Sequence, residues 1–408
     1  MKCKLAIVFL LLFTSSANCS QQNDDGAKSY IKRAVLENEL IDATESQLEA
    51  LIERSQSVEK FWMPKVSTNF ESKNYSISDR DLDKDETKFK VSSQLVGSGL
   101  LDSIDESNIN IKKKQFELLE QKNQIENDLL KNFSSLILYS QTMDLIMEMK
   151  NNSIDLHRRI SHNFESGIAS ESDLKQADLL IKKIDSDIIR YQSQMEIFRI
   201  NINKTGGLNF EGLKEGDYSI ISEILSLDPS YDINDNISLK LSRLDENISL
   251  IRAHKSNINW KGFLDYESKW ADTGVTENES YVGVRFDIDL FDYKKTKEND
   301  YNVKMLKSIK SSNNWMLKDL ENSLQLLEAD LNRNKIELKN LEEQLVTVKQ
   351  IYSSQLDNYD AGKVGFYEML ANEKEHLSLI NQIVNLKVAN VGFLIDLSSL
   401  CGKTAIKL

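Results

Sequence analysis

Much of the chain repeats apolar residues at alternating intervals of three and four positions. The clearest run follows Gly167, begins near Ser172 and comprises Leu174, Ala177, Ile181, Ile184, Ile188, Tyr191, Met195, Phe198 and Ile202. This heptad spacing keeps an apolar stripe against a partner helix when two helices supercoil. It predicts a helix that packs lengthwise on another helix, and a helix in an ordinary globular core is the alternative.

Two longer segments contain neither proline nor glycine and are predicted to be continuous helices. The first runs from about Asp102 to Asn163 and would extend for about 90 Å at a rise of about 1.5 Å per residue. The second runs from about Lys294 to Asp360 and has a leucine-rich seam with Asn334 as its single polar interruption. Shorter helices are expected at about 27–60, 234–256 and 366–400, so that each long helix has shorter ones to cover its side.

Between the helices the apolar period changes to two, which is typical of strands. The alternation is sharpest over 282–290, where every second residue is apolar (Val282, Val284, Phe286, Ile288 and Leu290). A second run spans Trp260 to Trp270, and together they predict a hairpin with one apolar face. The first half has a fainter pair, at Val66–Phe70 and Phe89–Leu95, with a polar, exposed loop between. Taken alone, these runs are also typical of surface strands in a small sheet.

The chain contains an internal duplication. Phe164, Gly167, Asp173 and Leu174 match Tyr359, Gly362, Glu368 and Met369, and the members of each pair lie 195 positions apart. The same offset takes Pro64, before the first strand, to Asn259, before the strand at Trp260. The strands and the helix ends therefore keep the same phase in both halves.

We divide the chain into a signal segment at 1–19, a first repeat at 20–207, a connector at 208–233, a second repeat at 234–402 and a short tail at 403–408. The expected fold class is mainly α with a small β part. Four strands cannot close a barrel, and open strand edges are not tolerated in lipid, so several chains must contribute. Three copies would supply twelve strands, an even number within the range of outer-membrane barrels.

The N-terminus has the features of a secretory signal, with Lys2 and Lys4 before an apolar run over 5–13 and small residues after it. Cys19, just beyond this run, is a candidate lipidation site, and plain cleavage near Ala17 is the alternative. The apolar run is too short to span a membrane, and no later stretch approaches the roughly 20 apolar residues that a spanning helix needs. Any membrane span is therefore expected to be β.

Charge and cysteine content narrow the function classes. The formal net charge is −13 and becomes −15 once Lys2 and Lys4 leave with the signal, which argues against nucleic-acid binding. Beyond the signal only Cys19 and Cys401 can remain, so neither a disulfide framework nor a CxxC metal site is available. We expect no enzyme activity, cofactor or metal, because the histidines are scattered and lack metal-binding spacing (His157, His162, His254 and His376).

The order of signal, helix, two strands and long helical hairpin, with the last three repeated, resembles the outer-membrane efflux protein (TolC) family over nearly the whole mature chain. The most specific matches are the tip segments at 164–177 and 359–370 and the run from Phe286 to Asp292. The resemblance implies a homotrimer in the outer membrane of a Gram-negative bacterium, with a pooled β-barrel and a periplasmic α-barrel. It also implies an exit duct for tripartite drug efflux or type I protein secretion. Its partners would be a periplasmic adaptor, an inner-membrane transporter and outer-membrane lipid.

The resemblance assigns adaptor docking to the turns at the two helical tips, namely Gly167, Ile168 and Ala169 in the first hairpin and Gly362, Lys363 and Val364 in the second. A glycine just past a helix end is also the usual C-terminal stop, and the two roles are compatible. Asp173 and Glu368 match acidic positions at the family's periplasmic constriction. Each also suits the first turn of a helix, where a carboxylate offsets the helix dipole.

Two positions depart from the family's pattern. Val364 stands where the family's gate has an arginine and Ala371 where it has a further aspartate, so its gating salt bridges are not carried over. Two competing interpretations remain. A secreted structural coiled-coil protein would explain the heptads and the acidity but neither the strands nor the duplication. A periplasmic adaptor normally has one helical hairpin, flanked by small β domains that this sequence lacks.

Overall fold

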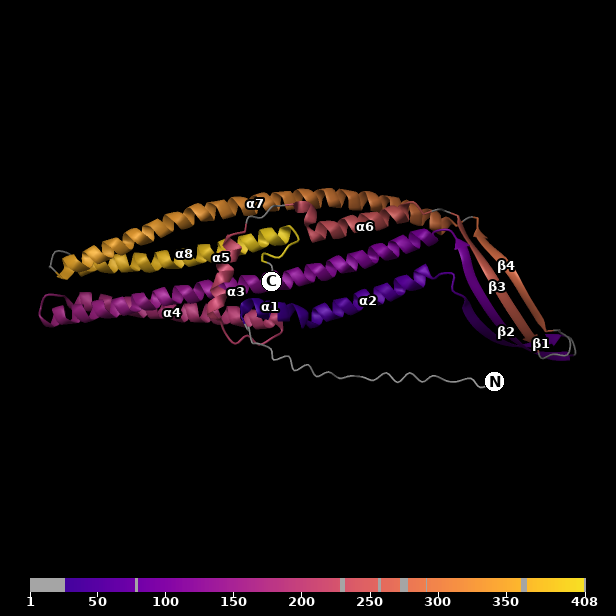
Figure 1. Ribbon diagram of the computed structural model, residues 1–408, viewed down its shortest axis with the longest axis horizontal. Helices are drawn as coiled ribbons and strands as arrows, with labels where there is room; N and C mark the ends of the chain where they lie inside the picture. Colours follow the sequence, from indigo (N-terminus) through magenta and orange to yellow (C-terminus); the bar gives the residue numbers. More distant parts are fainter. Residues whose placement is uncertain are drawn as a thin grey trace, which may run out of the picture.

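The computed structural model describes residues 26–77, 80–227, 232–255, 258–271, 278–290, 292–360 and 365–406. The molecule is elongated, with a four-stranded sheet at one end and two helical tips at the other (Figure 1). In chain order the elements are α1 (Ala27–Leu36), α2 (Glu39–Glu59), β1 (Lys65–Ile77), β2 (Arg80–Gly97), α3 (Leu100–Glu165), α4 (Glu171–Gly206), η1 (Glu215–Tyr218), α5 (Ser219–Leu225), η2 (Ile233–Asp235), α6 (Ile237–Ala253), β3 (Asn259–Ala271), β4 (Glu279–Asp289), α7 (Tyr293–Asp360) and α8 (Phe366–Leu400). The mainly α fold class with a small β part is confirmed.

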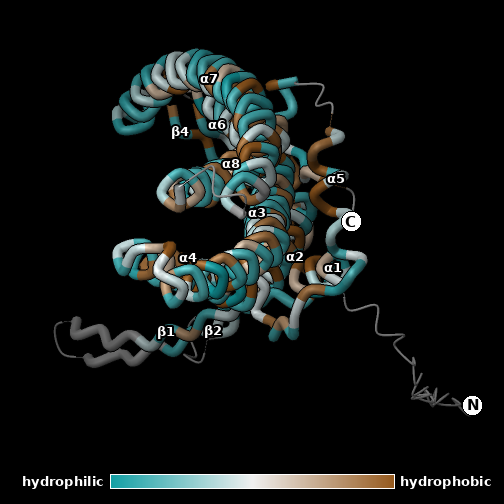
Figure 2. The backbone as a smooth tube through the Cα atoms, turned by 90° about the vertical axis from the view of Figure 1, so that its left-hand side faces the viewer, coloured by the Kyte–Doolittle hydropathy of each residue, from teal (hydrophilic) through white to brown (hydrophobic). Residues whose placement is uncertain are grey.

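Each long helix has shorter helices along its side. α2 and α4 pack on α3, α6 and α8 pack on α7, and α3 also contacts α6 and α8. The helices therefore form a curved wall with α7 at one edge and α2 and α4 at the other (Figure 2). α1 and α5 lie on the convex side of this wall.

Burial confirms the heptad seams predicted for α4 and α7. In α4 the seam faces α3, and Ile184 is fully buried. In α7 the polar interruption Asn334 is itself only 4% exposed. Other seam residues that are buried in the two helices are Ala177, Ile188, Tyr191, Ile202, Leu331, Leu341 and Val348.

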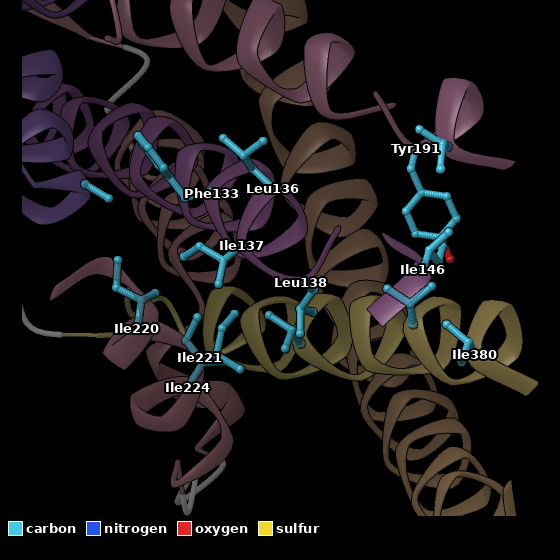
Figure 3. Packing of buried hydrophobic residues seen from close by; sticks show 14 of the residues in the cluster. Phe133, Leu136, Ile137, Leu138, Ile146, Tyr191, Ile220, Ile221, Ile224 and Ile380 are labelled. Carbon is cyan, nitrogen blue, oxygen red and sulfur yellow. The ribbon is translucent and has the colours of Figure 1, made fainter. Parts of the chain in front are cut away.

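The middle of α3 is the most completely enclosed part of the fold, because all residues from 133 to 138 are buried. The Phe133 ring lies 5.5 Å from the Tyr30 ring of α1 and 5.0 Å from the Phe210 ring, centroid to centroid. The Tyr30 hydroxyl donates to the carbonyl oxygen of Leu208 at 2.7 Å. Figure 3 shows α5 and α8 completing the same cluster through Ile220, Ile221, Ile224 and Ile380.

Two expectations about helices are wrong. The helix expected over 27–60 is broken, since α1 ends at Leu36 and α2 begins at Glu39. Asn38 takes an extended conformation between them, and its side chain caps α2 by accepting from the Leu40 N–H at 2.9 Å.

The expectation that no later stretch could span a membrane also fails, because α8 is long and apolar enough by composition. α8 instead packs on α3, α4, α5 and α7 within the helical core.

The strands of the first half are longer than predicted. In place of short strands with an exposed polar loop between them, β1 and β2 pair continuously from Lys65 opposite Ser92 to Ile77 opposite Arg80. Ladder hydrogen bonds join main-chain groups, so a polar segment can pair once its partner continues the register. The full sheet has the order β1-β2-β3-β4, and every neighbouring pair is antiparallel.

Candidate functional site: an amphipathic sheet and two helical tips

One face of the sheet is apolar and exposed. The register aligns alternate residues of all four strands on it, so that Val282 lies opposite Tyr266, which lies opposite Val91, which lies opposite Val66. Val282 is 70% exposed and Phe286 63%. The exposed large apolar residues of this face are Val66, Phe70, Val96, Trp260, Leu264, Tyr266, Trp270, Val282, Val284, Phe286 and Ile288. A continuous apolar surface of this kind marks a site of contact with lipid or protein.

The opposite face of the sheet is polar and charged, as the alternation predicts. Ion pairs cross this face from strand to strand: Arg285 Nε lies 2.8 Å from Asp265 Oδ2, and Lys269 Nζ lies 3.2 Å from Glu86 Oε1. One face of the sheet therefore suits hydrocarbon and the other suits water.

The sheet has two open edges. Among the described residues, β1 pairs only with β2 and β4 only with β3. The outer side of each edge strand thus presents main-chain N–H and C=O groups with no strand beside them, which is a template for pairing with another chain.

The first helical tip contains the predicted glycine stop. α3 ends at Glu165, and Gly167 has φ of 72°, the left-handed conformation that favours glycine. The Ile168 N–H then donates to the carbonyl oxygen of Asn163 at 2.8 Å. At the end of the hairpin Ile168 is 78% exposed, whereas Ala169 packs against the core.

Asp173 belongs to the N-terminal cap of α4. The Ser170 hydroxyl accepts from the Asp173 N–H at 3.2 Å, and Asp173 Oδ2 accepts from the Ser170 N–H at 3.0 Å. This reciprocal capping box satisfies main-chain donors that the helix itself leaves free. The structure therefore gives Asp173 a role in starting the helix, and its role at a constriction stays a prediction.

The second tip is described only in part. Glu368 is exposed in the first turn of α8, at the position equivalent to Asp173. The side-chain amide of Asn163 in α3 donates to the hydroxyl of Tyr359 in α7 at 3.1 Å, so the two tips meet within one chain. The sequence did not indicate this contact. Four predicted site residues lie outside the described residues, namely Cys19, Gly362, Lys363 and Val364.

A buried ionisable cluster lies farther along α8. Glu373 is 2% exposed and receives a hydrogen bond from Tyr352 of α7. Burial raises the pKa of Glu373 to about 7, and burial together with the charge of Lys349 lowers the pKa of His376 to about 4. Among the described residues, neither Glu373 Oε2 nor His376 Nε2 has a hydrogen-bond partner. The signal that could have revealed this cluster is a glutamate within the apolar heptad seam of α8.

Other candidate chemistry is sparse in the part of the chain that the structure describes. No group of three or more metal-ligating side chains occurs among those residues, and Cys401 is a buried free thiol. His157 is partly buried, and its Nε2 lies 2.8 Å from Asp178 Oδ1. This contact joins α3 to α4.

These features define a structural class. A wall of long heptad helices ends at paired tips on one side and at an amphipathic, open-edged sheet on the other, and this unit order occurs twice in the chain. This is the fold of the outer-membrane efflux protein (TolC) family, as the resemblance in sequence implied.

Solved structures of outer-membrane proteins share this fold. A structure of CusC, described in connection with transmembrane channel formation, superimposes with a TM-score of 0.80 at 11% identity, over 93% of this chain and 92% of CusC. For the outer-membrane protein VceC from Vibrio cholerae the TM-score is 0.77 at 9% identity, over 93% and 97% of the two chains. The CmeC outer-membrane channel of Campylobacter jejuni gives 0.70 at 12%, over 92% and 85%. The sequence matches no protein-family model and no curated protein.

The buried cluster predicts two opposite pH dependences of stability. The raised pKa of Glu373 means that its contribution to the free energy of unfolding is complete below about pH 4.5 and is lost as the pH rises through 7. The lowered pKa of His376 means that its contribution is complete above about pH 6.5 and is lost as the pH falls through 4. In the native protein the two effects oppose each other.

Of these two groups, Glu373→Gln retains only His376, so we expect this variant to lose more stability than the native chain as the pH falls from 7 to 4. His376→Gln retains only Glu373, so it should lose more stability than the native chain as the pH rises from 4.5 to 7. Urea denaturation of both variants across this range, with the native chain as the control, measures how each slope differs from the native slope. Differences of the same sign in the two variants would contradict the assignment.

Proposed function

We propose that three copies of this chain form a channel in the outer membrane of a Gram-negative bacterium. It would be the exit duct of a tripartite efflux or type I secretion system, in which an inner-membrane transporter and a periplasmic adaptor deliver the substrate. The observation that carries the proposal is the sheet, which has one exposed apolar face and two open edges. The alternative, a structural coiled-coil protein, does not explain an exposed apolar sheet face.

Closure of the sheet explains the number of copies. Each chain supplies four strands in strict antiparallel order, so β4 of one copy can pair with β1 of the next without interrupting the alternation. Three copies give twelve strands, whereas two would give eight, which leave little room for a channel. Closure also removes every open edge from the lipid.

The two edges of the helical wall support the same assembly. α7 exposes large apolar side chains on one edge (Trp315, Leu326, Ile336 and Val346), and α4 does so on the other (Leu179, Ile189, Ile197 and Ile200). Adjacent copies in a ring would bring these two edges together and remove the apolar surface from water. The threefold rotation that relates the copies would then close both the sheet and the helical wall.

The dimensions of the apolar face fit a bilayer. Trp260 and Trp270 lie near the two ends of β3, ten residues apart, which is roughly 33 Å along a strand. With the strand tilt of about 40° found in membrane barrels, this becomes a band about 25 Å high flanked by aromatic residues. We infer that the two tryptophans lie at the two interfaces of the membrane.

The tips would face the inner membrane. In this arrangement the docking residues are Gly167, Ile168 and Ala169 together with Gly362, Lys363 and Val364, and Asp173 and Glu368 would surround the periplasmic opening. The high exposure of Ile168 supports docking, because an apolar side chain at the end of a hairpin gains free energy when a partner covers it. Threefold symmetry would gather the acidic side chains and favour cations at the opening.

Adjacent residues of β1 test the orientation of the sheet. Val66→Arg places a charge on the apolar face, and Ser67→Arg places the same charge on the polar face. We expect Val66→Arg to cost roughly 2–4 kcal/mol per chain in the membrane and to deplete trimers from outer-membrane fractions, whereas Ser67→Arg assembles normally. Unheated gel electrophoresis and conductance in planar bilayers measure assembly and function. A native chain that is soluble, not trimeric and non-conducting would refute the channel itself.

Ile168→Asp tests docking at the first tip. We expect its affinity for the purified cognate adaptor to fall at least tenfold, or about 1.4 kcal/mol, because a charge would replace the exposed apolar contact. The matched control is Leu36→Asp at the end of α1, where the side chain is 75% exposed but lies far from the tips (Figure 1). Equal affinities for the two variants would argue against docking through Ile168.

A further inference from the structure

The polar face of the sheet conceals two of its negative charges. Asp265 is 3% exposed and Glu86 is 7% exposed, although both project from the face that the sheet leaves open. A carboxylate this deeply buried is strongly destabilising unless positive or hydrogen-bonding groups surround it. The groups that cover these two carboxylates therefore determine which charge the surface presents.

Asp265 of β3 is held by side chains from the two neighbouring strands, β2 and β4. Its Oδ2 accepts from Arg285 Nε of β4 at 2.8 Å and lies 3.4 Å from Lys90 Nζ of β2, and its Oδ1 accepts from the Ser92 hydroxyl at 2.5 Å. Gly283 lies directly opposite Asp265 on β4, so no side chain there competes for the space.

The Arg285 guanidinium has further partners that fix its position. It is 4.4 Å from the centre of the Phe263 ring, a cation–π distance, and it also pairs with Asp287. The Arg285 side chain is 42% exposed and that of Lys90 33%, whereas the Asp265 side chain is 4% exposed. The cations thus lie nearer the water than the carboxylate that binds them.

The same layering recurs farther along the sheet, at Glu86 of β2, which lies opposite Ala271 of β3. Glu86 pairs with Lys88 at 2.9 Å and with Lys269 at 3.2 Å. Its side chain is 9% exposed, against 34% and 31% for the two lysines. At these two positions, therefore, cationic groups cover buried carboxylates.

We propose that Asp265 is a selectivity-determining residue of the channel, because it holds Arg285 and Lys90 in ion pairs and so prevents the wall from favouring anions. This inference rests on the proposed function, in which the polar face lines the pore. In a trimer the arrangement occurs three times around the wall, and rings of charged side chains control which ions a pore passes. Removing the buried carboxylate would take away the counter-charge that Arg285 and Lys90 share. Among the residues that the structure describes, Arg285 would keep only Asp287 as an ion-pair partner, and Lys90 would keep only Glu267, at 3.9 Å.

Asp265→Asn tests the proposal in the full-length trimer. Purified protein is placed in a planar bilayer under a KCl gradient, and the reversal potential gives the permeability ratio of K⁺ to Cl⁻. We expect Asp265→Asn to lower this ratio by roughly twofold or more relative to the native channel. Arg285→Gln should change it in the opposite direction, because it removes a cation from the same cluster.

Asp289→Asn is the matched control. It removes the same charge from the same face, but Asp289 accepts from the neutral Asn259 amide at 2.9 Å, so no cation is released. The proposal expects Asp289→Asn to shift the ratio by less than half as much as Asp265→Asn. Equal shifts would mean that only net charge matters and would overturn the role of Asp265.

Unheated gel electrophoresis of each variant shows whether trimers have formed. If Asp265→Asn does not assemble, Arg285→Gln decides the matter. A rise in the ratio that is at least twice the shift caused by Asp289→Asn supports the proposal, and a smaller or absent rise overturns it. A native chain that forms no conducting channel would refute the proposed function, and the inference with it. A conducting native channel whose selectivity is insensitive to Asp265 and Arg285 would refute the inference alone.

Discussion

The requirement that main-chain groups be hydrogen-bonded governs this molecule more than any single side-chain contact. β1 and β4 each leave one edge unpaired within the described chain, and an unpaired N–H or C=O group in hydrocarbon costs several kcal/mol. An exposed apolar face and open edges are tolerable together only if the apolar face meets lipid and the edges meet other strands. These two features of the sheet therefore support the proposed arrangement, in which the apolar face meets a membrane and the edges meet further copies of the chain.

The duplicated helices follow from the same requirement. Each repeat supplies one strand hairpin joined to one helical hairpin, so in the proposed ring every strand hairpin would have its own helical support. The heptad seams hold the helices of each hairpin in lengthwise contact, while the enclosed centre at Phe133 connects α1, α3 and the connector. The helical wall thus connects the sheet at one end of the molecule to the tips at the other (Figure 1).

The features that could be predicted are those with a period. Ile184 and Leu341 lie in heptad seams, and the spacing of these seams predicted which face of each helix packs against a partner helix. Val284 alternates with polar neighbours in one of the clearest strands. Local polar contacts could not be predicted, because they do not recur at regular intervals along the chain. The Asn38 side chain caps α2 and so separates it from α1, and the Asn163 amide joins the two tips by one hydrogen bond. The full length of β1 depends on main-chain pairing with β2, which its polar side chains do not encode. Glu373 is visible in the sequence as a charge among the apolar positions of α8, but its burial depends on how α8 packs against the other helices.

The central claim is that copies of this chain close into a ring of three around an amphipathic sheet. The most direct test is the native mass of the protein extracted from outer membranes in mild detergent, measured by mass spectrometry without crosslinking. The account predicts a single species with the mass of three mature chains. A monomer, a dimer or a series of open-ended oligomers would contradict it.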